Sequence, residues 1–238
     1  MGSLATRSSE LKRLLSLSAQ RLLVDLSMWS ADLARLGDEL ARAGDLTDIF
    51  HFDVSDGRFA PGFLFFPDLI AALRPLTSRL FHAHLMLEDP AAHLDSFISA
   101  GVDIITLHAE SRGDIPAALE RIRDAGCLCG IALRADSLVN ALAPCLPLVD
   151  LVLLMGTPLG IKGCEAGAQA LERLKTARSL IDAAGPGRVL LTADGAIRSH
   201  TVPGLYAAGA DMVTPGSLVF GNPDMRAAFA WLHGLRRS

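Results

Sequence analysis

The stretch "ARAGDLTDIFHFDVSDG", residues 41–57, holds the pattern that decides the fold of this chain. A helix-like segment ends at Gly44, an apolar run follows over residues 48–54, and Asp56-Gly57 makes a turn. The same order of helix end, glycine and strand returns at "ISAGVD", "RDAGC" and "YAAGAD". Strands that alternate with helices in this way predict a parallel sheet.

Eight such units run along the 238-residue chain. The predicted strands are 21–27, 48–54, 79–86, 103–108, 127–133, 149–155, 188–193 and 211–214. The predicted helices are 31–43, 67–73, 91–100, 115–125, 137–143, 167–184, 199–208 and 224–235. The strand runs are almost continuously apolar, which is typical of a sheet covered by helices. This pattern predicts an α/β fold, a closed (β/α)8 TIM barrel. An open dinucleotide-binding sheet is less favoured, because no Gly-x-Gly-x-x-Gly follows the first strand.

Residues 21–238 are expected to form this barrel as a single catalytic domain, because no linker or change of composition divides them. Residues 1–20 precede it as an extension in which "ELKRLLSLSAQ" has the apolar spacing of a helix. We expect an extra N-terminal helix packed on the barrel floor. The extension lacks the long apolar core of a secretory signal. Its Arg and Ser residues would be compatible with a transit peptide, but Glu10 argues against one.

Composition excludes several classes of function. The formal net charge is only −4, and no Lys/Arg cluster is present, so nucleic acid is not an expected partner. No apolar stretch is long enough to cross a membrane, and none is expected to bind one. The four cysteines lack zinc-ribbon spacing, and Cys127 and Cys129 are expected to be small core residues. A reducing cytoplasm is the expected location.

Polar side chains stand at the ends of three predicted strands: His51 and Asp53 in "FHFDVSDG", His84 in "FHAHLM", and Asp194 in "LLTADGA". The carboxyl ends of parallel strands all point to one face, where active sites are built. Residues two apart share a side of a strand, so His51 and Asp53 face inward together. The same period fits His82, but His84 lies nearer the end of its strand.

These four residues predict a divalent-metal site. Two imidazoles and two carboxylates suit zinc, and manganese, iron or cobalt would also fit. The two carboxylates could also move protons on opposite sides of a bound substrate. Glycine-rich turns follow the last two strands at "DGA", residues 194–196, and "PGS", residues 215–217. These loops are the usual phosphate cradle of such a barrel.

Seven segments spread along the chain are similar to motifs of one known enzyme family: "LSMWSADLARLGDEL", "HFDVSDGRFAPG", "HAHLMLEDP", "AGVDIITLHAE", "VDLVLLM", "ADGAI" and "GSLVFGNPD". From about Leu22 to Met225, the chain resembles the ribulose-phosphate 3-epimerases. The resemblance implies that the chain is an isomerase that interconverts D-ribulose 5-phosphate and D-xylulose 5-phosphate, or epimerises another ketose phosphate. It also implies a homo-oligomer, either a dimer or a hexamer, and no redox cofactor.

Roles transfer from the resemblance residue by residue. His51, Asp53, His84 and Asp194 would hold the metal, and Asp53 and Asp194 would be the catalytic acid/base pair that acts through an enediolate. The expected substrate-binding residues are Ser30, His84, Met86, Met155, Gly160, Gly163, Gly195, Ala196, Gly216 and Ser217.

The chain departs from the family pattern mainly around the pocket. The loop "GTPLGIKGCE", residues 156–165, replaces the usual Asn-Pro-Gly-Phe-Gly-Gly-Gln and adds Lys162. Ala196 stands for a glycine, Ser55 for a methionine, Arg58 for a histidine and Trp29 for a smaller aliphatic residue. Trp29 and Ser55 are expected to reshape the pocket. Lys162 or Arg198 could strengthen a phosphate site, bind a carboxylate, or remain solvated loop charges.

Two other classes of function stay open. Relatives in the same superfamily perform decarboxylation or aldol-type chemistry, but "DVSDG" lacks the lysine of their motif. A sugar-phosphate-binding barrel without activity is the non-enzyme alternative, and both acid/base aspartates argue against it.

Overall fold

The computed structural model describes residues 4–185 and 189–237 as a closed barrel of parallel strands in sequence order, which confirms the predicted fold class. The strands are β1 (Leu23–Ser27), β2 (Ile49–Ser55), β3 (Leu80–Met86), β4 (Ile104–His108), β5 (Leu128–Leu133), β6 (Leu151–Met155), β7 (Leu190–Asp194) and β8 (Met212–Thr214). Arg188, the expected start of the seventh strand, lies outside the described residues, as do 1–3 and 238. Pairing of Leu23 with Met212 closes the ring.

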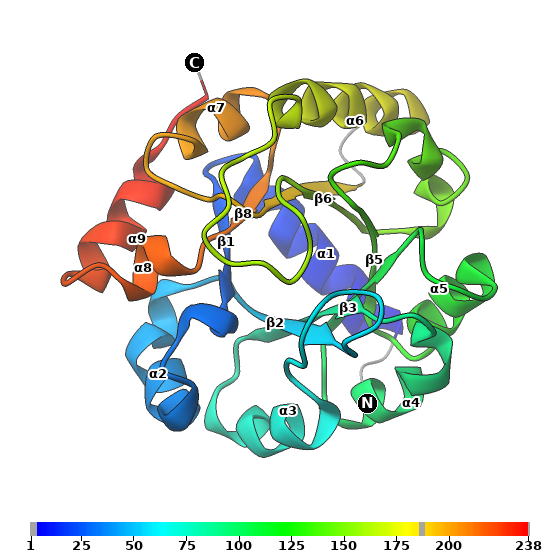
Figure 1. Ribbon diagram of the computed structural model, residues 1–238, viewed down its shortest axis with the longest axis horizontal. Coiled ribbons are helices and arrows are strands. Elements are labelled where there is room, and N and C mark those ends of the chain that lie inside the picture. Colours follow the sequence, from blue (N-terminus) through cyan, green and yellow to red (C-terminus); the bar gives the residue numbers. More distant parts are fainter. Residues whose placement is uncertain (1–3, 186–188, 238) are drawn as a thin grey trace.

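Helices surround the ring of strands (Figure 1). They are α1 (Leu4–Ser18), α2 (Leu36–Ala43), α3 (Pro67–Leu73), α4 (Leu94–Ser99), α5 (Ile115–Asp124), α6 (Ala170–Ala184), α7 (Val202–Ala207), α8 (Ser217–Phe220) and α9 (Met225–Gly234). Within the described ranges, no helix combines the length and apolar character needed to cross a bilayer.

One predicted helix is wrong. Residues 137–143 hold only a short 3₁₀ turn, Val139–Leu142, and a second one follows at Leu146–Leu148. Pro144 explains the difference, because it has no backbone N–H to donate and so prevents an α-helix from continuing past Ala143. The short helix α8, directly after β8, was not predicted.

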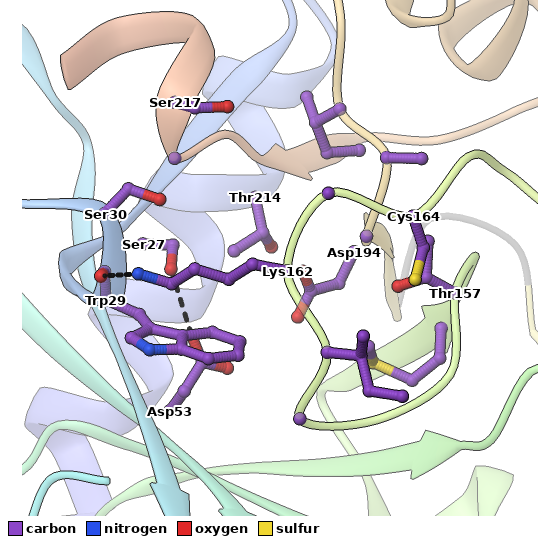
Figure 2. A pocket seen from close by; sticks show the side chains of 18 of the residues that line it. Ser27, Trp29, Ser30, Asp53, Thr157, Lys162, Cys164, Asp194, Thr214 and Ser217 are labelled. Atoms are coloured by element: carbon purple, nitrogen blue, oxygen red, sulfur yellow. Dashed lines mark hydrogen bonds between the residues drawn. The ribbon is translucent and has the colours of Figure 1, made fainter. Parts of the chain in front are cut away.

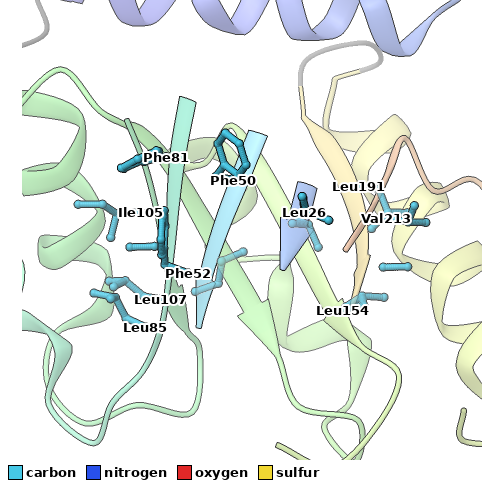
Figure 3. Close-up of a cluster of buried hydrophobic side chains, with 14 of the residues drawn as sticks. Leu26, Phe50, Phe52, Phe81, Leu85, Ile105, Leu107, Leu154, Leu191 and Val213 are labelled. Carbon is cyan, nitrogen blue, oxygen red and sulfur yellow. The ribbon is translucent and has the colours of Figure 1, made fainter. Parts of the chain in front are cut away.

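All eight strands are buried along their length. Side chains alternate between the two faces of a strand, and the outward ones, such as Phe52, Phe81 and Ile105, pack in the layer between sheet and helices (Figure 3). Cys127 and Cys129 are buried free thiols in this layer, as predicted. Inward-facing side chains form a separate inner cluster that includes Leu23, Ile49, Leu80, Ile104, Leu128, Leu151, Leu190 and Met212.

Helix α1 covers the floor of the barrel. Leu14 is fully buried within the inner cluster, and Leu11, Leu15 and Leu17 pack against it. Figure 1 shows α1 crossing the centre of the ring. The amphipathic segment therefore buries its apolar stripe against residues from all eight strands, which confirms the expected extra N-terminal helix.

Four aspartates tie neighbouring strands together at the floor. Each stands just before an even-numbered strand, accepts a backbone N–H from the preceding odd-numbered strand and pairs with an arginine. The ion pairs are Asp48–Arg21, Asp103–Arg74, Asp150–Arg7 and Asp211–Arg178, and the N–H donors are Val24, Phe81, Cys129 and Leu191. Arg7 comes from α1, so this helix contributes a charge as well as apolar surface.

Replacing Leu14 by alanine should lower the free energy of unfolding by about 2–5 kcal/mol, because the change leaves a cavity in the fully buried inner cluster. Urea denaturation followed by circular dichroism measures the loss. Leu138, which is 82% exposed, is the matched control, and Leu138→Ala should change stability by less than about 0.5 kcal/mol. Equal effects of the two substitutions would mean that α1 does not pack on the floor in solution.

Candidate active site

A cavity of about 260 Å³ opens at the carboxyl ends of the strands (Figure 2). Its walls come from the loops after β1, β6, β7 and β8 and from the ends of β2 and β3. Except for His84, every residue expected to bind substrate lines it: Ser30, Met86, Met155, Gly160, Gly163, Gly195, Ala196, Gly216 and Ser217. Asp53 and Asp194 also line it. Their roles stay predictions, but the structure places them around one space.

The four predicted metal ligands meet at the inner end of this cavity. Their ligand atoms all lie within 4.8 Å of one another. His51 Nε2 is 3.1 Å from Asp53 Oδ1, and His84 Nδ1 is 3.3 Å from the same oxygen. Both nitrogens lie 3.7 Å from Asp194 Oδ2. Two imidazole nitrogens and two carboxylate oxygens therefore converge on one point.

The register of the sheet explains this convergence. Asp53 on β2 pairs with His84 on β3, and Asp194 on β7 pairs with Met155 on β6. All four ligands point inward at the carboxyl end of the barrel, from opposite sides of the ring. His82, two residues earlier on β3, also points inward but lies one layer deeper, where it contacts Asp25 rather than Asp53.

The donor set fits a divalent cation. Asp194 Oδ2 is buried and has no hydrogen-bond partner among the described residues, although both histidines face it. A buried carboxylate oxygen without a partner is costly, and a cation at this point would satisfy it. Two nitrogen and two oxygen donors suit zinc and its neighbours in the first transition row.

Burial and neighbouring charges shift the pKa values of the two carboxylates in opposite directions. Burial pushes the pKa of Asp53 upward, but the two neighbouring imidazoles of His51 and His84 outweigh it, so this pKa lies well below its usual range. Burial, reinforced by the charge of Asp53, raises the pKa of Asp194 to about 7. Burial lowers the pKa of His84 to about 3. Of the two carboxylates, Asp53 is therefore the stronger acid and Asp194 the weaker.

Ser27 is a site residue that the sequence interpretation missed. It is the last residue of β1, and its hydroxyl donates a hydrogen bond of 2.9 Å to Asp53 Oδ2. It also lines the cavity. The signal was available, because Ser27 stands at a strand end in the same way as Asp53. Among the residues in and after the first strand, interpretation of the sequence chose only Ser30 as a substrate contact.

The loop after β6 crosses the mouth of the cavity. Lys162 reaches over the pocket in Figure 2, donates a 2.6 Å hydrogen bond to the carbonyl of Trp29, and lies 4.7 Å from the centre of the indole ring. Gly160 adopts a positive φ of 68°, and a Cβ there would lie 2.7 Å from the carbonyl oxygen of Pro61. This loop therefore touches the loops after β1 and β2, and glycine permits the second contact.

Of the other residues that depart from the family pattern, some line the cavity and some do not. Trp29 lines the cavity, as expected. Ser55 does not line the cavity, contrary to expectation, because its hydroxyl donates hydrogen bonds to the carbonyls of Ala60 and Gly62 and so shapes the loop after β2. Arg58 is exposed and pairs with Glu88.

Arg198 also lines the cavity, with Nη1 3.3 Å from the hydroxyl of Ser217. Its neighbour Ala196 has a φ of 54°, the left-handed region that favours glycine. Gly216 approaches Ser30 so closely that a Cβ would overlap the serine Oγ. These features shape the turns after β7 and β8 around the predicted phosphate cradle.

Comparisons with known proteins identify the family of this chain. The profile of the Ribulose-phosphate 3 epimerase family matches residues 23–220. Ribulose-phosphate 3-epimerase of Bacillus subtilis is 32% identical over 211 residues, covering 87% of this chain and 96% of the relative. Ribulose-phosphate 3-epimerase 2 of Cupriavidus necator is 36% identical over 218 residues, covering 89% of this chain and 90% of the relative.

Solved structures share the barrel at much lower identity. A 3-hexulose-6-phosphate synthase superposes with a TM-score of 0.62 at 16% identity, covering 90% of this chain and 98% of that one. Orotidine 5'-phosphate decarboxylase from Pyrococcus horikoshii gives 0.63 at 15% identity, covering 89% and 97%. These matches support the fold alone. The family profile and the sequence relatives go further: the chain belongs to the ribulose-phosphate 3-epimerase family and is an enzyme of the isomerase class.

Proposed function

We propose that the chain catalyses the metal-dependent 3-epimerisation of a ketose phosphate, with D-ribulose 5-phosphate and D-xylulose 5-phosphate as the default pair. The observation that carries the proposal is the meeting of Asp53 and Asp194, from opposite sides of the barrel, at one cavity. Epimerisation next to a ketone needs a base on one face of the carbon and an acid on the other. Two carboxylates on opposite walls meet this requirement.

The surroundings of each carboxylate support separate roles. Asp53, ionised and held by Ser27, is suited to remove the proton at carbon 3. Asp194, whose pKa is raised by burial and by the charge of Asp53, is suited to deliver a proton from the other face, and the roles exchange in the reverse direction. A bound divalent cation supplies stabilisation of the negative charge that develops on the substrate oxygens in the enediolate. Met86 and Met155 line the cavity and exclude water without adding charge.

Deuterium exchange tests the proposal. Ketose phosphates of four to six carbons, each paired with its unphosphorylated sugar, are incubated with the zinc-loaded protein in heavy water. We expect one of the phosphates to gain deuterium at carbon 3 and to appear as both epimers. A protein with bound metal that exchanges none of them would contradict the proposal, and preference for an unphosphorylated sugar would overturn only the ketose-phosphate assignment.

We place the substrate phosphate beside the turns after β7 and β8. Backbone N–H groups of Gly195, Ala196, Gly216 and Ser217 would cradle it, since the backbone rather than the side chains supplies the donors. Arg198, next to Ser217, would add a cation. Lys162 is less suited, because its ammonium group already donates a hydrogen bond to the carbonyl of Trp29.

Arg198→Ala should raise the Michaelis constant for the phosphorylated ketose by about tenfold or more, because one charge-assisted hydrogen bond is worth about 1.5–3 kcal/mol. The Michaelis constant for the unphosphorylated sugar should change little. Steady-state kinetics with both substrates measures the difference. Arg58→Ala is the control, since Arg58 is exposed and outside the pocket lining. An equal change for both sugars would show that Arg198 does not contact the phosphate.

The remaining expectations concern the assembled protein. A homo-oligomer, dimer or hexamer, and a cytoplasmic location stay predictions. Light scattering coupled to size-exclusion chromatography measures the first.

A further inference from the structure

A second buried cluster lies one layer below the predicted metal ligands. Asp25 on β1, His82 on β3 and Thr106 on β4 have no exposed surface. Asp25 Oδ2 is 2.8 Å from Nδ1 of His51 and 2.7 Å from Nδ1 of His82. None of these three residues lines the cavity or takes part in the proposed proton transfers. A carboxylate buried this deeply is costly without compensation, so its place beside a metal ligand calls for an explanation.

Hydrogen-bond chemistry assigns the protons in this cluster. An ionised carboxylate only accepts, so the Nδ1 atoms of His51 and His82 must both carry the hydrogen. The Nε2 of a neutral His51 then holds a lone pair, and this atom faces Asp53 and Asp194. The Nε2 of His82 is left as an acceptor, and the hydroxyl of Thr106 lies 2.7 Å from it. A Cβ at Gly130 would collide with that hydroxyl, so glycine leaves room for the last contact.

His84 is oriented by an independent chain of contacts. Glu110 Oε2 lies 3.2 Å from Nδ1 of His108, and His108 Nε2 lies 2.8 Å from Nε2 of His84. The carboxylate places the hydrogen of His108 on Nδ1, so Nε2 of His108 accepts from His84. His84 therefore carries its hydrogen on Nε2 and presents the bare Nδ1 to the carboxylates. The two ligand histidines must bind through opposite ring nitrogens.

We propose that Asp25 is a positioning residue for the cation site, which orients His51 by accepting the Nδ1–H of both His51 and His82. The inference rests on the cation site of the proposed function. Hydrogen bonding at the second ring nitrogen fixes the orientation of a metal-binding imidazole and raises its basicity. Asp25 has a further effect, because its charge lies behind the ligand and attracts a cation bound on the other side of the ring. His82 holds Asp25 in place and has no contact with the cation.

Tautomers in the wild-type protein give the first test. Nitrogen-15 NMR of histidine side chains in the zinc-loaded protein should show His51 and His82 as Nδ1–H tautomers, His84 as the Nε2–H tautomer, and a metal-shifted Nε2 resonance for His51. A His51 that binds zinc through Nδ1 would overturn the inference. This test uses the unaltered chain, so it holds even if substitution of Asp25 prevents folding.

Metal affinity gives the second test. Asp25→Asn should weaken zinc binding by about 10- to 100-fold in chelator competition, since loss of such an outer partner typically has this effect. His82→Gln keeps a donor for Asp25 and should leave the affinity within about threefold of wild type. Asp150→Asn is the matched control, because Asp150 is equally a buried carboxylate but belongs to the barrel floor. It should lower stability without changing zinc affinity.

The outcomes separate this inference from the proposed function. Wild-type zinc affinity in a folded Asp25→Asn variant would overturn the inference while epimerase activity stands. Two zinc ions per chain would place an ion among Asp25, His51 and His82, where the inference places hydrogens, and would also overturn it. A protein with the expected tautomers and affinities that exchanges no substrate deuterium would instead contradict the proposed function alone.

Discussion

Asp53→Asn and Asp194→Asn should each lower epimerase turnover by at least about 10²–10⁴-fold, because each removes proton transfer on one face of the substrate. The loss should exceed the usual value for one acid or base, since both carboxylates are also predicted metal ligands. Turnover is measured in a coupled assay with zinc in excess, and bound metal is measured on the same samples. Asp45→Asn, at a fully exposed carboxylate, should leave turnover unchanged.

Deuterium exchange measures the contribution of each carboxylate separately. A variant that keeps one carboxylate and its metal can still remove a proton from one epimer, even though it cannot complete the inversion. We expect Asp194→Asn to exchange deuterium into one epimer at most, and Asp53→Asn into the other at most. Near-normal turnover of either variant with metal bound would show that the two-carboxylate mechanism is wrong.

His51→Ala and His84→Ala should each weaken zinc binding by more than about 100-fold, because loss of even an outer partner of a ligand typically weakens it by about 10–100-fold. Metal content after gel filtration, measured by plasma mass spectrometry, should fall from one ion per chain to a small fraction, and turnover should fall with it. His93→Ala, at an exposed histidine, is the matched control.

A crystal structure of the zinc-loaded protein checks the same prediction by geometry. The ion should lie roughly 2.0–2.2 Å from the nitrogen and oxygen ligand atoms. An ion bound far from Asp194, or full metal content in His51→Ala, would contradict the four-residue site.

Most of the fold could be predicted because barrel strands carry a strong local signal. Each strand is an apolar run bounded by polar or turn-forming residues, often including glycine or proline, and such a pattern depends little on distant residues. The grouping of the four predicted metal ligands followed from one rule, since the carboxyl ends of parallel strands share a face. The α-helix expected over 137–143 is replaced by a short turn, because Pro144 has no backbone N–H to continue a helix despite the apolar spacing before it.

The surroundings of the site could not be predicted in the same way. Strand period points both His82 and His84 inward, and only the depth of each within the closed barrel shows that one meets Asp25 and the other Asp53. Contacts between side chains far apart in the sequence also depend on the folded structure. Lys162 and Trp29 are 133 residues apart, and nothing local indicates that they meet over the mouth.

Helix α1 has a consequence for synthesis of the chain. It leaves the ribosome before every strand, yet the inner cluster that buries Leu14 includes Met212 of β8. Until that last strand emerges, the helix has no complete surface to cover, so its apolar stripe stays exposed to solvent and to chaperones. Ribosome-stalled chains ending before residue 212 should therefore be cleaved by protease at Lys12 and Arg13, whereas the released full-length chain should resist.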